Sequence, residues 1–118
     1  SIRIFCYPQE VFPPTDFHTA TLVDARIIVI GCLGYPQSRQ SGRTPVYYLD
    51  VKTMRISELP TWGDAPGWIS RHKTKLSNRD LVVTDGEVWV ETTEGFDIVS
   101  NSNRFALNLD SLIWTKLD

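Results

Sequence analysis

The chain has 118 residues, a net charge of −2, 42% hydrophobic residues and 22% charged residues. This balance is typical of one globular domain, excludes a disordered chain and gives no reason to expect a nucleic-acid partner. No run of about 18 apolar residues is present, so we expect no membrane span. The two cysteines, Cys6 and Cys32, lie in apolar runs. This favours buried thiols in a cytoplasmic protein over the alternative of a disulfide between them.

Short runs of β-branched and aromatic residues, separated by turn residues, predict an all-β protein without helices. In chain order we expect strands at residues 2–7, 18–23, 26–31, 45–50, 55–59, 72–77, 81–84, 104–108 and 112–117, with long loops at 33–45 and 87–100. Residues 27–30 and 81–83 are apolar at every position, which predicts burial on both faces. We therefore expect two antiparallel sheets of about four strands packed face to face.

The sequence contains an internal repeat. His72 aligns with His18 at an offset of 54 residues, which places residues 81–83 under residues 27–29. Trp114 aligns with Ile56 at an offset of 58 residues. The difference is a four-residue insertion in the long central loop of the second unit. Each unit therefore has about four strands in a little over 50 residues.

These units resemble the kelch repeats of β-propellers. The resemblance rests on a His before each first strand, a Gly near the end of each second strand, aromatic residues in each third strand and a Trp in the fourth: His18 and His72, Gly31 and Gly86, Tyr47, Tyr48 and Phe105, and Trp114. The chain departs from the family pattern in three places: the Gly-Gly pair that ends the second strand is incomplete in both units, and Ile56 stands in place of the first Trp. Residues 34–50 also resemble a segment of bacterial kelch-containing proteins.

The resemblance implies a single kelch-like domain of antiparallel four-stranded blades. Residues 1–12 would be an orphan fourth strand of a preceding repeat, residues 13–66 the first blade and residues 67–118 the second. Propellers need about four to eight blades to close, so this would be a partial or oligomer-completed β-propeller. Three alternatives follow: a piece of a longer protein, association of copies, or an open packing. Of the oligomers we expect a two-fold dimer that brings the basic loop 33–45 near the acidic loop 87–100.

Seven residues are candidates for a binding site because they lie in long loops or form a basic stripe: Tyr35, Arg39, Arg43, Trp68, Arg71, Lys73 and Trp89. The stripe Arg71, Lys73 and Lys75 suggests an anion site, although lysines that protect a strand edge are the favoured interpretation. The histidines His18 and His72 are interpreted as structural, since they recur at equivalent positions. No catalytic motif, metal-ligand set or cofactor signature is present.

The sequence therefore predicts a non-catalytic binding or scaffolding module that recognises a protein or peptide through its long loops. The alternative, from a different class, is a carbohydrate-binding or carbohydrate-active protein that uses Trp62, Trp68, Tyr35 and the two histidines.

Overall fold

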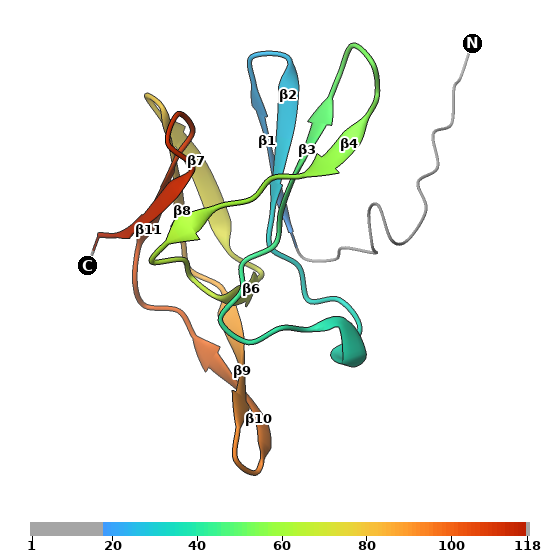
Figure 1. The fold of residues 1–118 in the computed structure, drawn as a ribbon. Helices are drawn as coiled ribbons and strands as arrows, with labels where there is room; N and C mark the ends of the chain where they lie inside the picture. The colour runs from blue at the N-terminus through green and yellow to red at the C-terminus, as the bar shows by residue number, and fades with distance from the viewer. Residues whose placement is uncertain (1–17, 118) are drawn as a thin grey trace.

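The computed structural model describes residues 18–117, so the strand predicted at residues 2–7 lies outside the described residues. The described part is all-β and contains three sheets (Figure 1). Within residues 18–117 there is no α-helix, and therefore no helix that could cross a membrane; one helical turn, η1 (Pro36–Ser38), is of the 3₁₀ type. The prediction of an all-β protein is confirmed.

The first sheet has four antiparallel strands in chain order: β1 (Thr19–Val23), β2 (Arg26–Ile30), β3 (Val46–Asp50) and β4 (Ile56–Glu58). Each begins and ends within one residue of its predicted range. A two-residue turn joins β1 to β2, and Asp24 adopts the positive φ of 56° that such a turn requires. The turn from β3 to β4 is held by Asp50, whose carboxylate accepts the N–H groups of Lys52 and Thr53.

The second sheet has five strands in the order β5 (Trp62–Gly63), β12 (Ile113–Lys116), β11 (Phe105–Asn108), β8 (Asp80–Thr84) and β7 (Lys73–Ser77). All pairs are antiparallel except β5 with β12. The short strand β5 was not predicted. It depends on Gly63, which has a φ of 95°, and any Cβ there would clash with the Trp114 carbonyl.

The two sheets repeat each other in register as well as in strand order. Ile27 lies opposite Leu49 in the first sheet, and the aligned residues Leu81 and Leu107 lie opposite each other in the second. Asn108 also caps its turn as Asp50 does, by accepting the N–H groups of Asp110 and Ser111. The sequence alignment of the two units therefore matches the strand pairing.

The main core lies between these two sheets. The first sheet contributes Val23, Ile28, Ile30 and Val46, the second contributes Leu81, Val83, Phe105, Leu107 and Trp114, and Ile69 also joins this cluster. A smaller cluster of Val29, Tyr47 and Ile56 occupies the far face of the first sheet. The predicted burial on both faces holds for residues 28–30. It is wrong for β8, where Val82 is partly exposed between the buried Leu81 and Val83.

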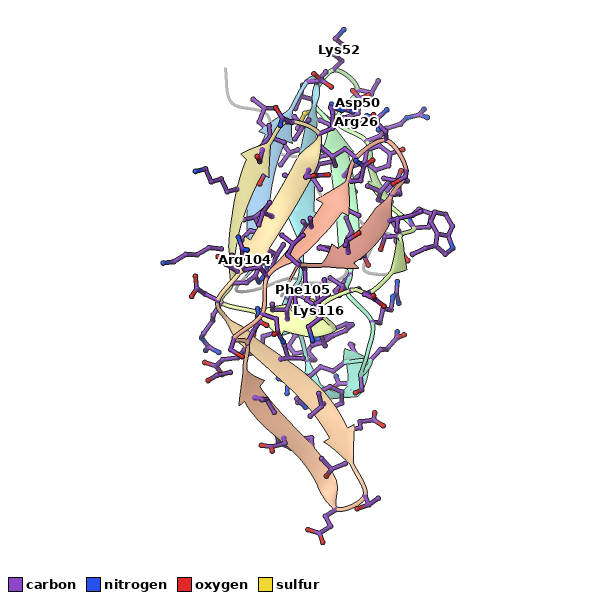
Figure 2. All side chains as sticks on the ribbon, turned by 90° about the vertical axis from the view of Figure 1, so that its left-hand side faces the viewer. Arg26, Asp50, Lys52, Arg104, Phe105 and Lys116 are labelled. Atoms are coloured by element: carbon purple, nitrogen blue, oxygen red, sulfur yellow. The ribbon has the colours of Figure 1, made fainter. Side chains whose placement is uncertain are left out.

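A third sheet corrects the prediction of two sheets. Residues 87–100, predicted as a loop, form a hairpin of β9 (Glu87–Thr92) and β10 (Gly95–Ser100). The order of this sheet is β10, β9, β6, where β6 is Trp68–Ser70. Figure 2 shows the hairpin projecting from the end of the molecule opposite Arg26, Asp50 and Lys52.

Candidate functional site

Three of the seven candidate binding residues, Arg39, Trp68 and Trp89, meet at the base of the β9–β10 hairpin. Trp68 on β6 and Trp89 on β9 lie opposite each other in the sheet and are both buried, in a cluster with Cys32. The indole N–H of Trp68 donates to the carbonyl of Leu33 at 2.9 Å. The segment 31–45, which also contains Tyr35 and Arg39, is thus fixed to the third sheet.

Arg39 also holds the segment 31–45 in place, through hydrogen bonds to its backbone. Its Nε donates to the Leu33 carbonyl at 3.0 Å, and its Nη2 donates to the Gly34 carbonyl at 3.2 Å. The guanidinium lies 6.0 Å from the centroid of the Trp89 ring, which itself stacks on Phe96 at 6.1 Å. Cation–π contact and hydrogen bonding make Arg39 an anchor of the segment in this conformation.

The predicted attraction between the basic segment 33–45 and the acidic segment 87–100 takes a different form. Both segments lie in one chain, and the N–H of Glu91 donates to Ser41 Oγ at 3.1 Å. No ion pair joins them among residues 18–117, because Arg43 pairs with Glu58 on β4 instead. A hydrogen bond and the contact of Arg39 with the Trp89 ring, rather than pairs of opposite charges, connect the two segments.

The remaining candidates are spread over the surface. Arg71 and Lys73 are exposed where the chain enters β7, the last strand of its sheet, which agrees with lysines at a strand edge. Tyr35 is 52% exposed, and Trp62, which only the carbohydrate alternative uses, is 60% exposed. Trp68, on which the carbohydrate alternative depended, offers no free ring face in this conformation because it is buried.

His72 is buried between the two large sheets, where its Nε2 lies 3.0 Å from Thr19 Oγ1. Burial lowers the pKa of His72 to about 4. The ring is therefore neutral at neutral pH. Among residues 18–117 no three potential metal-ligating side chains come together.

The sequence reasoning missed the most exposed apolar strand of the described chain. Phe96, Ile98 and Val99 on β10 are 60%, 43% and 47% exposed. This strand pairs with β9 on one side only, so its other edge is unpaired within residues 18–117. The N–H of Ile98 donates to the carboxylate of its neighbour Asp97 at 2.8 Å rather than to β9. The run Phe96 to Val99 after Gly95 was the signal that could have identified it.

Comparisons with known proteins indicate the fold alone. No protein-family model and no curated protein matches the sequence. The solved structure described as "Structure of YjhT" is similar, with a TM-score of 0.66 at 16% sequence identity. The match covers 88% of this chain and 38% of that one, so the chain spans well under half the length of that structure.

Proposed function

We propose that the two large sheets are adjacent blades of a kelch-type propeller. The support is that β1 to β4 and the strands β7, β8, β11 and β12 share strand order, register and the capped turns at Asp50 and Asn108. Two such sheets do not close a ring, and none of the sheets in residues 18–117 closes on itself.

The way the two sheets pack also supports this proposal. The face of the first sheet that contacts the second carries Ile28 and Ile30. The residues aligned with them, Val82 and Thr84, alternate with the buried positions of β8 and therefore lie on the face of the second sheet that points away from the first. The face of the second sheet that contacts the first carries Leu81. The residue aligned with Leu81 is Ile27, which packs against the cluster on the opposite face of the first sheet. The contact is therefore head-to-tail, as in a propeller, rather than two-fold.

We propose further that the chain is a non-catalytic module that binds an extended segment of a protein partner at the free edge of β10. The observation that carries this proposal is the unpaired, exposed apolar strand itself. An exposed strand edge is a template for an added strand, with main-chain hydrogen bonds for affinity and side chains for specificity. The partner strand would displace Asp97 from the N–H of Ile98.

Charge on the hairpin defines the chemistry of the partner. Residues 87–100 contain four acidic residues and no basic one: Glu87, Glu91, Glu94 and Asp97. A strand that alternates basic and apolar residues would place its cations near these carboxylates and its apolar side chains beside Phe96 and Ile98. The partner is thus a basic, β-prone peptide segment.

Replacing Ile98 by proline tests this site. Proline removes an edge donor that faces away from β9, where edge strands tolerate it. Ile98→Thr is the matched control, since it keeps the N–H and the β-branched shape. The probe is a short capped peptide of alternating lysine and valine, followed by isothermal titration calorimetry. We expect saturable binding to the parent and to Ile98→Thr, and its loss in Ile98→Pro; equal binding by both variants contradicts the edge site.

A further inference from the structure

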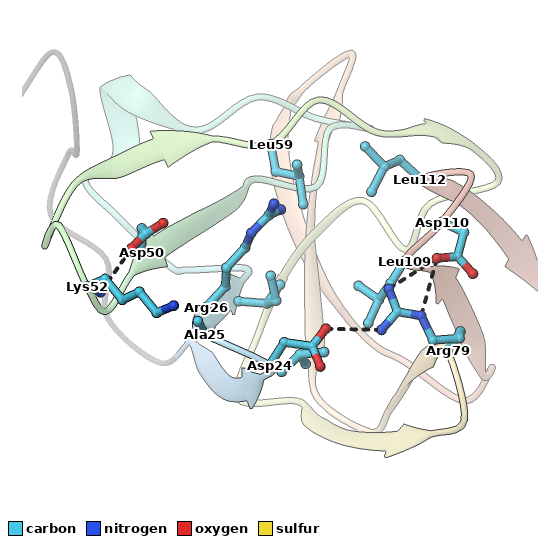
Figure 3. A pocket seen from close by; sticks show the side chains of 12 residues that line it. Asp24, Ala25, Arg26, Asp50, Lys52, Leu59, Arg79, Leu109, Asp110 and Leu112 are labelled. Atoms are coloured by element: carbon cyan, nitrogen blue, oxygen red, sulfur yellow. Dashed lines mark hydrogen bonds and ion pairs between the residues drawn. The ribbon is translucent and has the colours of Figure 1, made fainter.

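The end of the molecule opposite the β9–β10 hairpin contains a cavity of about 510 Å³. It lies where the core between the two large sheets opens toward their turns (Figure 3). Its apolar lining comes from Val23, Ile28, Leu59, Leu109 and Leu112. All of these except Leu112 belong to the main core or pack against it, so the cavity is continuous with the solvent-exposed end of that core.

Most of the charged groups that line the cavity are already paired. Arg79 donates to Asp110 Oδ1 from Nη2 at 3.1 Å and lies 3.5 Å from Asp24 Oδ2. The third carboxylate, Asp50, accepts the N–H groups of Lys52 and Thr53 at 2.9 and 3.1 Å. These N–H groups lower the pKa of Asp50, so the turn holds it as a carboxylate. The pairings neutralise Arg79 and occupy all three lining carboxylates.

Arg26 is different, because it makes no ion pair with any of the described residues. It alternates with Ile28 and Ile30 on β2 and therefore lies on the face of the first sheet that packs on the second. Its guanidinium lies 5.0 Å from the centroid of the Tyr48 ring. Figure 3 shows this side chain directed toward Leu59, across the cavity. An arginine stacked on an aromatic ring presents its donors in a fixed fork.

We propose that this cavity binds a carboxylate attached to an apolar group, with the carboxylate on Arg26 and the apolar group on Leu59, Leu109 and Leu112. A guanidinium fork matches a carboxylate in a bidentate way, and the leucines supply a water-excluding surface next to it. Lys52, which also lines the cavity, adds a second positive charge without an ion-pair partner among the described residues. A cationic ligand would meet carboxylates that are already occupied.

Two sources supply this chemistry, a small organic acid and the C-terminus of a peptide chain, and two probes distinguish them. The first is 4-methylpentanoate and the second is N-acetyl-leucine, each compared with its amide. Titration followed by ¹H–¹⁵N NMR should give saturable shifts at the turns that line the cavity. We expect the carboxylates to bind about tenfold more tightly than the amides, as the loss of a charge-assisted pair implies. The tighter of the two acids identifies the source.

Variants assign the effect to Arg26. Arg26→Met should weaken carboxylate binding about tenfold, and Arg26→Lys should weaken it less because the charge is kept while the fork is lost. Lys75→Gln removes a positive charge from the exposed face of β7, outside the cavity, and should leave binding unchanged. The NMR spectra report directly whether each variant is folded. Equal binding of acid and amide, no saturation below about 10 mM, or unchanged affinity in folded Arg26→Met overturns the proposal.

Discussion

Thr19 Oγ1 lies 3.0 Å from Nε2 of His72, and the same hydroxyl lies 2.6 Å from Thr74 Oγ1. Thr19 is on β1, and His72 directly precedes β7, so this small network joins the edge strands of the two large sheets. His72 is buried and both threonines are partly buried, so the protonation state of His72 matters for stability.

The free energy of unfolding should decrease as the pH is lowered, because of His72. Its pKa is about 4 in the folded chain and 6.5 ordinarily, so between these values the unfolded chain binds a proton that the folded chain does not. The stabilisation is complete above pH 6.5 and is lost as pH falls toward 4. Between about pH 7 and pH 5 the loss is about 2 kcal/mol in the free energy of unfolding. Urea denaturation of His72→Gln should show a flatter pH profile than the parent and than the control Lys75→Gln; three parallel profiles contradict this role.

Trp114 should contribute far more to stability than its neighbour Trp62. Trp114 is buried in the main core and its indole N–H donates to Thr61 Oγ1 at 3.0 Å. Trp62, on the adjacent strand β5, is largely exposed. Trp114→Ala should lower the free energy of unfolding by about 3–5 kcal/mol, and Trp62→Ala by about 1 kcal/mol or less. Similar denaturation midpoints for the two variants would show that Trp114 is not a core residue.

Arg39 should control the order of the segment 31–45. Arg39→Met removes two hydrogen bonds to the backbone and the contact with Trp89, so the link from Ser41 to the Glu91 N–H should open more often. Hydrogen exchange of the Glu91 amide should then be severalfold faster. Arg43→Met loses only an exposed ion pair with Glu58 and serves as the control. The anchoring role is rejected if both variants exchange at the parent rate.

Self-association, if it uses the far faces of the two sheets, should be head-to-tail. The outer face of the first sheet, with Val29 and Ile56, is equivalent by the repeat to the face of the second sheet that packs on the first. The outer face of the first sheet in one copy could therefore contact the outer face of the second sheet in another copy, as the two sheets contact each other within one chain. Such contacts form rings or open arrays rather than the two-fold dimer expected from the sequence. Light scattering during gel filtration should show a mass that rises with concentration beyond two chains. A constant mass of one or two chains contradicts head-to-tail assembly.

The sequence was sufficient to predict the repeating part of the fold. Eight strands of the two large sheets were predicted to within one residue, because alternating β-branched runs and Asx turns such as those at Asp50 and Asn108 are local signals. Ile56 and Trp114, which the repeat alignment places at equivalent positions, are both buried. Because the two units repeat, the strand assignment in one unit can be checked against the aligned residues of the other.

Two short strands could not be predicted in the same way. The short strands β5 and β6 have two and three residues and exist only because β12 and β9 pair with them from far along the chain. The binding candidates chosen as loop residues met a similar limit. Trp68 and Trp89 lie in loop-like sequence and were candidates for stacking on a ligand, but tertiary packing with Cys32 buries them. Long-range pairing, which no local pattern encodes, decided both outcomes.

Amide exchange at Ile98 tests the central claim, that β10 binds an extended peptide through its free edge. The Ile98 N–H faces away from β9, whereas an antiparallel hairpin directs the N–H of alternate residues such as Val99 toward its partner strand. Adding the lysine–valine peptide should therefore slow exchange at Ile98 and leave Val99 unchanged. Unchanged exchange at Ile98 under saturating peptide, or protection confined to the Arg26 end of the molecule, would contradict the account.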